Sequence, residues 1–306
     1  MRKKYTITNW KEYNESLRQR GNITLWLDEE FQKDWIIPDK TGRKGASPYF
    51  SDKCIEFMVT IYRVFKLSLR ATQGFVQSLF SLKEISLDVP DYTTVSKRKG
   101  KIKVKIPSRS KGNIHLVMDS TGIKVFGEGE WKVRTHGYSK RRTWLKFHFS
   151  VNEATKEVES IAVTDNSVSD HEVFDELVDN VTSEVNIDKL SADGAYDKKA
   201  VFKSCKKKRI KPLIPPRENA VLSDDADLSE RNEIIDWIEL SGKDDWKIEN
   251  NYHRRSIAEN FVFRFKTIFG EKVNSRGFNN QKTDLMVAAK IINKFNSLGM
   301  PEFISK

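Results

Sequence analysis

Three acidic residues stand at positions from which their side chains could be brought together. Asp119 is expected at the end of a short apolar strand, Asp193 at the end of a later strand, and Glu259 on a charged helix face. Ends of such strands can be neighbours in a mixed sheet, and a helix packed on that sheet can present a glutamate to both. Carboxylate oxygens suit Mg²⁺ or Mn²⁺, and two such ions can activate a water or a 3′-hydroxyl in phosphodiester chemistry. Each acid alone is also typical of a strand end or a turn.

The segment "YHRRSIAENFVFRFK" predicts an amphipathic helix with a strongly charged stripe. At about 100° per residue, steps of three, four and seven put four polar residues on one side: Tyr252, Arg255, Glu259 and Lys266. Apolar residues fall on the opposite side and would anchor the helix: Ile257, Phe261, Phe265 and Ile268. The alternative is a solvated helix face with an Arg255–Glu259 pair, although Arg before Glu is the poorer orientation for such a pair.

The charge balance predicts a polyanionic partner. The 306 residues carry a net charge of +11, and the pI is about 9.4. Basic residues gather in blocks, among them "SKRKGKIKVK", "WKVRTHGYSKRRTW" and "CKKKRIK". Aromatic residues flank the second block, as expected of a surface that meets nucleic acid. The candidate DNA contacts in the first two blocks are Lys97, Arg98, Lys99, Arg134, Arg141 and Arg142.

Residues 1–111 predict a helical DNA-binding region that ends in a basic linker. Helix patterns fall in "TNWKEYNESLRQRG", "SPYFSDKCIEFMVTIYRVFKL", "SLRATQGFVQSLFSLKE" and "PDYTTVSKRKGK". Three closely spaced helices, the last of them basic, resemble a helix-turn-helix arrangement whose final helix could enter a major groove. A plain three-helix bundle is the alternative. Residues 95–111 favour DNA binding, because they hold eight Lys or Arg and no acid.

Residues 112–306 predict an α/β domain. The run "IHLVMDST" suits a buried strand, "RTWLKFHFSVN" alternates like a half-buried strand, and "VESIAVTD" returns beside it. Helices and strands then alternate as far as "IKPLIPP", and helices follow. This order favours a mixed sheet covered by helices. The acidic, amphipathic stretch near 218–248 is expected to be a helical surface insertion.

Cysteine usage and hydropathy suggest a cytoplasmic protein. The two cysteines, Cys54 and Cys205, have no partners at zinc-ligand spacing and allow at most one bridge. The N-terminal segment lacks the apolar core of a signal peptide. Since no stretch approaches 18 apolar residues, no membrane span is expected.

Three segments resemble those of bacterial insertion-sequence transposases of the DDE type, in the family-five group. They are "VMDSTGIKVFGEGEWKVRTHGYSKRRTW", "SADGAYD" and "YHRRSIAENFVFRFK", within a resemblance over about residues 40–300. The resemblance implies a ribonuclease-H-like core that uses a divalent metal, Mg²⁺ or Mn²⁺, and binds terminal inverted repeats. It assigns the metal to Asp119, Asp193 and Glu259. It also implies that Tyr252, Arg255 and Lys266 hold the DNA end beside that metal.

The expected function is therefore transposition. The enzyme would cut the element ends and join the released 3′-hydroxyl to target DNA. Its partner is double-stranded DNA, and the two element ends suggest at least a homodimer in the complex. Two alternatives stay open: a non-catalytic DNA-binding repressor or host-adopted protein of the same fold, and a general nuclease whose cutting ignores the end sequence.

Overall fold

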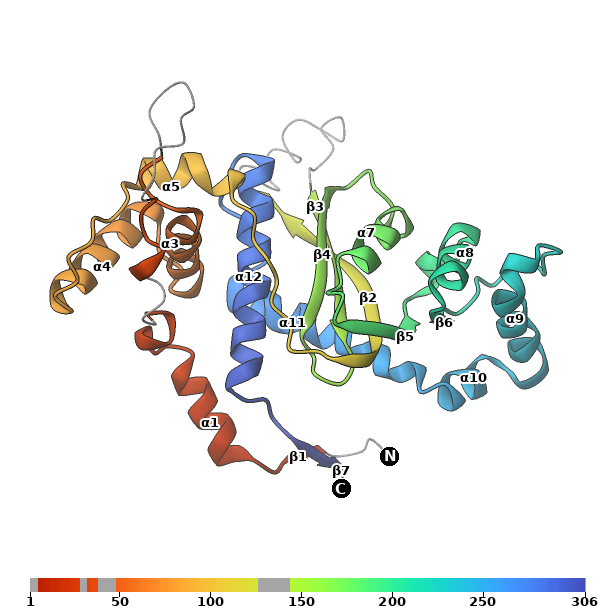
Figure 1. Cartoon of the computed structure of the whole chain (residues 1–306). Coiled ribbons are helices and arrows are strands. Elements are labelled where there is room, and N and C mark those ends of the chain that lie inside the picture. Colours follow the sequence, from red (N-terminus) through yellow and green to blue (C-terminus); the bar gives the residue numbers. More distant parts are fainter. Residues whose placement is uncertain (1–4, 28–31, 38–47, 126–143, 306) are drawn as a thin grey trace, which may run out of the picture. The chain divides into compact units, whose positions relative to one another are not determined.

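The chain forms two compact units. The computed structural model describes residues 5–27, 32–37, 48–125 and 144–305 (Figure 1). Unit 1 comprises Met1–Lys105 and Ser275–Lys306, and unit 2 comprises Ile106–Asn274. The sequence predicts a single boundary at residue 111, with all later residues in the second domain. In the structure the first boundary follows Lys105, and residues 275–306 belong to unit 1 because the last helix of the chain packs with the N-terminal helices. Hydrophobic patterns show that a helix is amphipathic, but they do not show which partner covers its apolar face.

Unit 1 is helical. Its α-helices are α1 (Trp10–Gln19), α3 (Asp52–Val64), α4 (Leu69–Leu82), α5 (Tyr92–Arg98) and α12 (Phe278–Leu298). Side-chain caps begin three of them: Ser51 accepts a hydrogen bond from the Cys54 N–H, Ser68 from the Ala71 N–H and Asp91 from the Thr93 N–H. A short ribbon of β1 (Tyr5–Ile7) and β7 (Phe303–Ser305) joins the two ends of the chain.

A buried ion pair lies inside unit 1. Lys99 Nζ is 2.8 Å from Asp284 Oδ1 on α12 and donates to Ser275 Oγ at 2.7 Å. Both charged side chains are inaccessible to solvent, at 2% and 0% exposure. The Lys99 carbonyl also accepts a hydrogen bond from the Thr283 hydroxyl. These bonds attach the end of the α5 segment to α12, and they explain why the C-terminal helix belongs to this unit.

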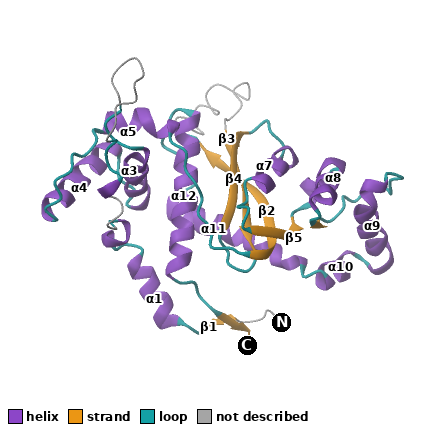
Figure 2. Cartoon of the chain, viewed as in Figure 1, coloured by secondary structure: helices purple, strands orange, loops and turns teal. Residues whose placement is uncertain are grey.

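Unit 2 is built on the mixed sheet that the sequence predicts. Its strands are β2 (Gly112–Lys124), β3 (Trp144–Asn152), β4 (Val158–Asp165), β5 (Val185–Ser191) and β6 (Lys211–Leu213) (Figure 2). Their spatial order is β4-β3-β2-β5-β6. Strand β3 pairs antiparallel with both β2 and β4, and β5 and β6 continue the sheet in parallel with β2.

Helices cover both faces of this sheet. The helices of unit 2 are α7 (Phe174–Asp179), α8 (Lys199–Lys208), α9 (Ser229–Ser241), α10 (Lys243–Glu249) and α11 (Ser256–Phe269). On one face, Phe147 and Phe149 of β3 meet Phe265 and Phe261 of α11, with ring centroids 4.9 and 4.5 Å apart. On the other face, β2 packs with α7 and α8 in one apolar cluster. Strand β3 is therefore buried on both sides, not half-buried: His148 and Ser150 are 0% exposed.

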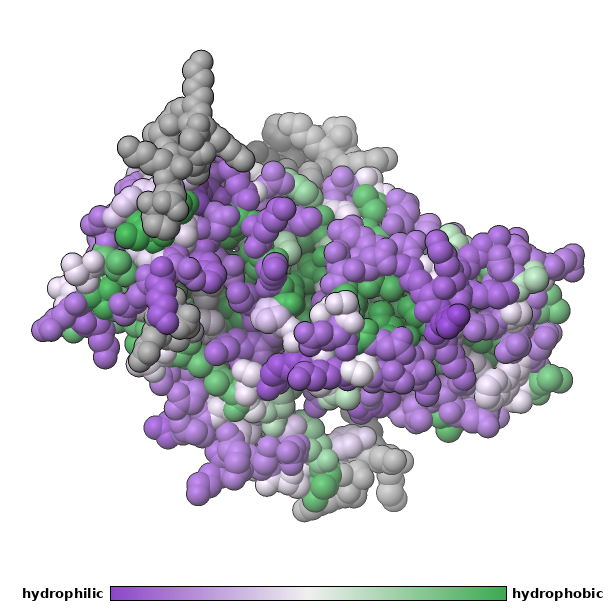
Figure 3. All heavy atoms as spheres, in the orientation of Figure 1, coloured by the Kyte–Doolittle hydropathy of each residue, from purple (hydrophilic) through white to green (hydrophobic). Residues whose placement is uncertain are grey.

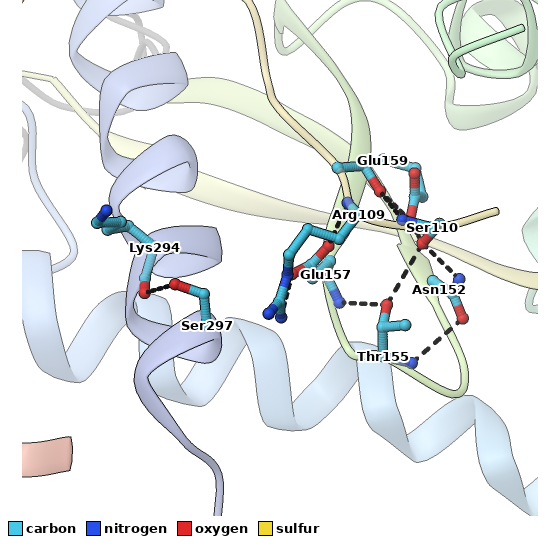
Figure 4. Close-up of polar contacts among 9 residues, drawn as sticks. Arg109, Ser110, Asn152, Thr155, Glu157, Glu159, Lys294 and Ser297 are labelled. Carbon is cyan, nitrogen blue, oxygen red and sulfur yellow. Dashed lines mark hydrogen bonds and ion pairs between the residues drawn. The ribbon is translucent and has the colours of Figure 1, made fainter. Parts of the chain in front are cut away.

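A polar cluster fixes the segment that enters β2 (Figure 4). Arg109 pairs with Glu157 at 2.6 Å, and the Arg109 N–H donates to the same carboxylate. Ser110 donates to Glu159 at 2.5 Å and accepts from Asn152 at 2.7 Å. Glu157 and Glu159 are buried, and burial raises the pKa of Glu159. The hairpin of β3 and β4 thus holds the first residues of unit 2 in place.

Hydrophilic residues cover most of the face of the molecule that Figure 3 displays. The most exposed large apolar side chains, such as Leu82 and Leu240, lie on different helices. Within the described ranges, no helix is both long enough and apolar enough to cross a membrane.

Candidate active site

Asp119 and Asp193 lie at the same level of the sheet. The parallel pairing of β2 with β5 ends at Val117 opposite Ser191, and each aspartate follows two residues later. Because side chains alternate along a strand, both carboxylates belong to the face of Val117 and Ser191. Asp119 lies inside the 13-residue strand β2, whereas the sequence predicts a strand end. The strand continues past Asp119 because its other edge still pairs with β3, as far as Lys124 opposite Trp144.

Asp193 stands where β5 passes into a short turn. Its Oδ1 accepts a hydrogen bond of 2.9 Å from the Ala195 N–H and so caps the 3₁₀ turn Gly194–Tyr196. Among the described residues, none donates a hydrogen bond to the other Asp193 oxygen. Strand β5 itself ends at Ser191, so Asp193 lies just beyond the strand.

Arg255 joins two of the three predicted acids. Its Nη1 lies 3.1 Å from Asp119 Oδ2, and its Nη2 lies 2.7 Å from Glu259 Oε1. Arg255 ends a 3₁₀ turn and Glu259 is in the first turn of α11, which docks through Phe261 and Phe265 on the same face of the sheet as Asp119. The Arg255–Glu259 pair of the solvated-face alternative is present. Its guanidinium, however, also reaches Asp119 on the sheet.

Tyr252 is not on the exposed stripe. The sequence pattern predicts a DNA contact, but Tyr252 is only 8% exposed, packs on Trp246 and donates a hydrogen bond of 2.9 Å to the Ala192 carbonyl. The physical reason is that residues 252–255 form a 3₁₀ turn before α11 begins, so Tyr252 does not follow the 3.6-residue period of the helix. Burial raises the pKa of Tyr252 to about 12, so the phenol stays protonated.

The electrostatics of the site favour a positive charge beside Asp119. Burial raises the pKa of this carboxyl, and the negative charges of Asp193 and Asp170 add to the effect. The Ser120 N–H and Arg255 oppose it. Arg255 is the cation that meets Asp119 in the structure, which fits an acidic site that must be neutralised by a cation.

One further acid, Asp170, was not among the residues predicted from sequence, although its charge acts on Asp119. Asp170 follows β4 and lies 3.2 Å from Lys146 Nζ and 3.3 Å from His148 Nδ1, and these two groups, His148 first, hold the pKa of Asp170 far below its usual range. Tyr196 is 1% exposed, and its hydroxyl has no hydrogen-bond partner among the residues that the structure describes. Burial raises the pKa of Tyr196 well above its ordinary value, and the nearby carboxylates add to this. The sequence signal for this site is that Lys146 and His148 interrupt the mostly apolar pattern of strand β3.

The donor set fits a divalent cation by its chemistry. Asp119, Asp193 and Glu259 offer only carboxylate oxygens, which hard cations prefer. Two of these acids already share one cation, the Arg255 guanidinium. Over the described part of the chain, no three His, Cys, Asp or Glu side chains form a group that could hold a metal ion as they stand.

The other predicted DNA contacts fall into three groups. Lys97 is exposed on α5, and Lys266, seven residues after Glu259, is half-buried on the same side of α11. Arg98 and Lys99 are instead used inside unit 1, where Arg98 bonds to the Phe50 carbonyl and Asp52, and Lys99 pairs with Asp284. A short helix can expose only part of its surface, so neighbouring basic residues point in different directions. The remaining three lie outside the described residues: Arg134, Arg141 and Arg142.

Two family models, each described as a transposase DDE domain, match this chain. One matches residues 110–294, more than half of the 306 residues, and includes Asp119, Asp193 and Glu259. The other matches residues 18–128. Together the matches take in all five strands of the mixed sheet and the helices α3, α4 and α5.

Proposed function

Because this chain belongs to the DDE transposase family, we propose that it cuts the ends of an insertion sequence and joins the released 3′-hydroxyl to target DNA. Membership of the family and the ribonuclease-H-like core, both predicted from sequence, are confirmed. The matched models do not specify the family-five group. The observation that carries the proposal is the cluster in which Arg255 connects Asp119 and Glu259 on the sheet face that also carries Asp193.

The catalytic residues in this proposal are the three acids. Asp119, Asp193 and Glu259 would hold Mg²⁺ or Mn²⁺, which when bound polarises the phosphate and lowers the pKa of the attacking hydroxyl or water. The sheet fixes the two aspartates, and the docked helix α11 fixes Glu259. Because Glu259 is 62% exposed, it can change its rotamer without unpacking the core.

Two basic residues of the same helix region would position the DNA end. Arg255 holds Asp119 and Glu259 in the free protein, and it can exchange one carboxylate for a phosphate when DNA and metal bind. Lys266 lies on the same side of α11 and offers a second phosphate contact. Tyr252 has a different role: its hydroxyl orders the backbone just before Asp193.

We assign recognition of the element ends to unit 1, and within it to α4. Helix α4 follows α3 after only residues 65–68, the short connection typical of a helix-turn-helix. Its solvent face carries small or uncharged polar residues at steps of three, four and seven: Gly74, Gln77, Ser78 and Ser81. Such a face can approach base edges closely, and glutamine pairs well with adenine. Helix α5 is the poorer candidate, because Arg98 and Lys99 are already engaged.

The alternative of a DNA-binding protein without catalysis must explain why the acidic cluster persists. Nothing in DNA binding alone requires partly buried carboxylates whose negative charges repel one another, as those of Asp119, Asp193 and Asp170 do. A general nuclease would need the same acids but no reading helix. Dependence of cutting on the sequence of the element end therefore distinguishes a transposase from a general nuclease. Metal-dependent cutting distinguishes both enzymes from a repressor.

The test begins with a search for an inverted repeat in the DNA that flanks the gene. It then compares a duplex that carries this repeat with a matched duplex in which the repeat is scrambled. We expect nicking and strand transfer on the first duplex only, in Mg²⁺ or Mn²⁺ and not with a chelator. Equal cutting of both duplexes would indicate a general nuclease. Tight binding to the end with no cutting in either metal would support the repressor. Crosslinking of the protein on two joined ends would test the expected homodimer in the complex.

A further inference from the structure

The surface of unit 2 is hollowed at the turn that follows Asp193. An open groove of about 640 Å³ begins at Gly194, the residue after this aspartate. The loop that follows β6 and the first residue of α10 form its other sides, with Pro215, Arg217, Glu218, Asn219 and Lys243. A second hollow of about 240 Å³ continues from it and shares Arg217 and Asn219 with it. We call the two hollows together the Arg217 groove.

The wall of the Arg217 groove is tied to the turn that carries Asp193. The Arg217 Nε–H donates to the Gly194 carbonyl at 3.3 Å, and the Arg217 backbone N–H donates to Asp197 at 3.0 Å. Asp197 is itself buried and pairs with Arg231 at 2.7 Å. The loop after β6 is therefore held against the catalytic turn before any ligand binds, which is the preorganisation that a positioning site needs.

Positive charge dominates the Arg217 groove. Arg217 and Lys243 are exposed in the larger hollow, and Lys198 and Lys199 line the smaller one. Glu218 is the opposing charge on the rim, since the carboxylate of Asp197 is already paired with Arg231. Four cations spread over two joined hollows match an extended polyanion better than a single small anion.

The chemistry of the lining indicates which part of a nucleic acid fits. Among the described residues that line the two hollows, none is aromatic, so no base can stack there. Arginine, lysine and asparagine side chains are the usual partners of phosphate oxygens, and such contacts fix position without reading sequence. The lining is thus suited to the sugar-phosphate backbone.

We propose that the Arg217 groove holds the backbone of one DNA strand where it leaves the catalytic carboxylates. This inference rests on the proposed function of the acidic site, because it uses Asp193 as the point from which the strand runs. A phosphate at Asp193 places the next nucleotides against the Gly194 turn and then beside Arg217 and Lys243. The groove sets the path of the strand and so helps to align the reacting phosphate. Arg217 and Lys243 are positioning residues in this proposal.

The native cysteines permit a direct test of occupancy. The sequence has only Cys54 and Cys205, both are buried, and burial raises the pKa of the Cys205 thiol to about 12. A Lys243→Cys variant therefore presents the one reactive thiol, which a maleimide can label. The matched control is Lys189→Cys: Lys189 is exposed on β5, about 13 Å of strand before Asp193 and outside the groove.

Labelling is measured in the full chain with Ca²⁺ in place of Mg²⁺, against two duplexes, and product analysis checks that neither duplex is cut. One ends at the scissile position, and the other continues beyond it as a single-stranded tail. We expect the tailed duplex to slow labelling of Lys243→Cys several-fold more than the blunt duplex does, and to leave Lys189→Cys unchanged. Equal labelling with either duplex, or equal protection of both cysteines, would contradict the proposal that the Arg217 groove holds a DNA strand.

A kinetic test separates this proposal from the proposed function. Lys243→Ala and Arg217→Lys should raise the KM for tailed substrate several-fold, with a smaller change in kcat and no such change for blunt substrate. Arg217→Ala is less informative, because it also removes the bond to Gly194. If wild-type protein cuts no DNA but the tail still protects Lys243→Cys, the proposed transposase activity is wrong, whereas binding of a DNA strand in the Arg217 groove is supported. If both variants cut DNA at the normal rate with an unchanged KM, the proposed role of the groove is wrong and the proposed transposase activity is unaffected.

Discussion

The Tyr252 hydroxyl donates a hydrogen bond of 2.9 Å to the carbonyl of Ala192, the residue directly before Asp193. Tyr252 is buried against Trp246, so this bond lies in the interior. It connects the turn that leads into α11 with the end of β5. The segment that supplies Arg255 and Glu259 is thereby tied to the segment that supplies Asp193.

Tyr252→Phe should slow catalysis without weakening DNA binding. The change leaves a buried carbonyl without its donor, which costs about 1–3 kcal/mol of stability. We expect a lower midpoint in urea, end binding within a few-fold of wild type, and slower strand transfer. Urea unfolding, gel shift and product analysis on one preparation would measure the three. A large loss of affinity for the element end, with unchanged stability, would instead support the prediction from sequence that Tyr252 contacts DNA.

Asp119→Asn, Asp193→Asn and Glu259→Gln should each abolish metal-dependent cleavage. Each variant removes one charged oxygen donor from the shared site. Because burial and neighbouring acids raise the pKa of Asp119, its ionised form is disfavoured in the fold, and Asp119→Asn should be at least as stable as wild type. Thermal unfolding beside a nicking assay checks both points. Wild-type cleavage by any one variant would remove that residue from the catalytic set.

Arg255→Ala should separate binding from chemistry. Loss of the guanidinium frees Asp119 and Glu259, while the apolar face of α11 is untouched. End binding should stay within a few-fold of wild type, because other contacts dominate it, whereas a misplacement of about 1 Å at the reacting phosphate costs on the order of a hundredfold in rate. Arg255→Lys should recover only part of the rate, since an ammonium cannot bridge two groups as a guanidinium does. Strand transfer by Arg255→Ala at the wild-type rate would mean that the stripe is only a solvated helix face.

Lys99 should matter for stability and Lys97 for DNA. Lys99→Met leaves Asp284 buried and unpaired, which should cost roughly 3–5 kcal/mol in urea unfolding. The double variant Lys99→Met, Asp284→Leu should recover much of this loss. Lys97→Met is the matched control: it should leave the midpoint unchanged and reduce the salt dependence of DNA binding. Equal stability of the two single variants would contradict the buried pair.

Glu159→Gln should stabilise the protein increasingly as pH rises. Burial raises the folded pKa of Glu159 above its ordinary value of 4.5, so the folded state holds this proton more tightly than the unfolded state. The stability from this group is fully present below pH 4.5 and is lost as pH rises through the folded pKa. Glutamine keeps an oxygen for Ser108 and Ser110 and has no charge to bury. The difference in Tm between variant and wild type should therefore widen from pH 4 to pH 7; a difference that is constant with pH would show that Glu159 does not titrate in this way.

Local patterns predicted the elements of the site but not their surroundings. Alternation along β3 correctly put Phe147 and Phe149 on one face, yet it also predicted a solvated face for His148, which is 0% exposed. The period of a strand decides which residues share a face, whereas a helix from elsewhere in the chain decides whether that face meets water. Asp170 escaped notice for the same reason, because its importance comes from His148 and Lys146 on a neighbouring strand.

The sequence by itself determined the family and the mixed sheet, and it predicted the three acidic residues of the proposed site, because each of these inferences depends on residue types at short spacing. Only the tertiary structure decided which polar side chains are accessible to DNA or metal and which are occupied by partners within the protein. It buried Lys99 against Asp284, turned Tyr252 inward to Ala192, moved α12 into unit 1 and placed Arg255 between Asp119 and Glu259. The free energy of a charged side chain depends on the solvent and partners around it, and residues far apart in the chain supply both.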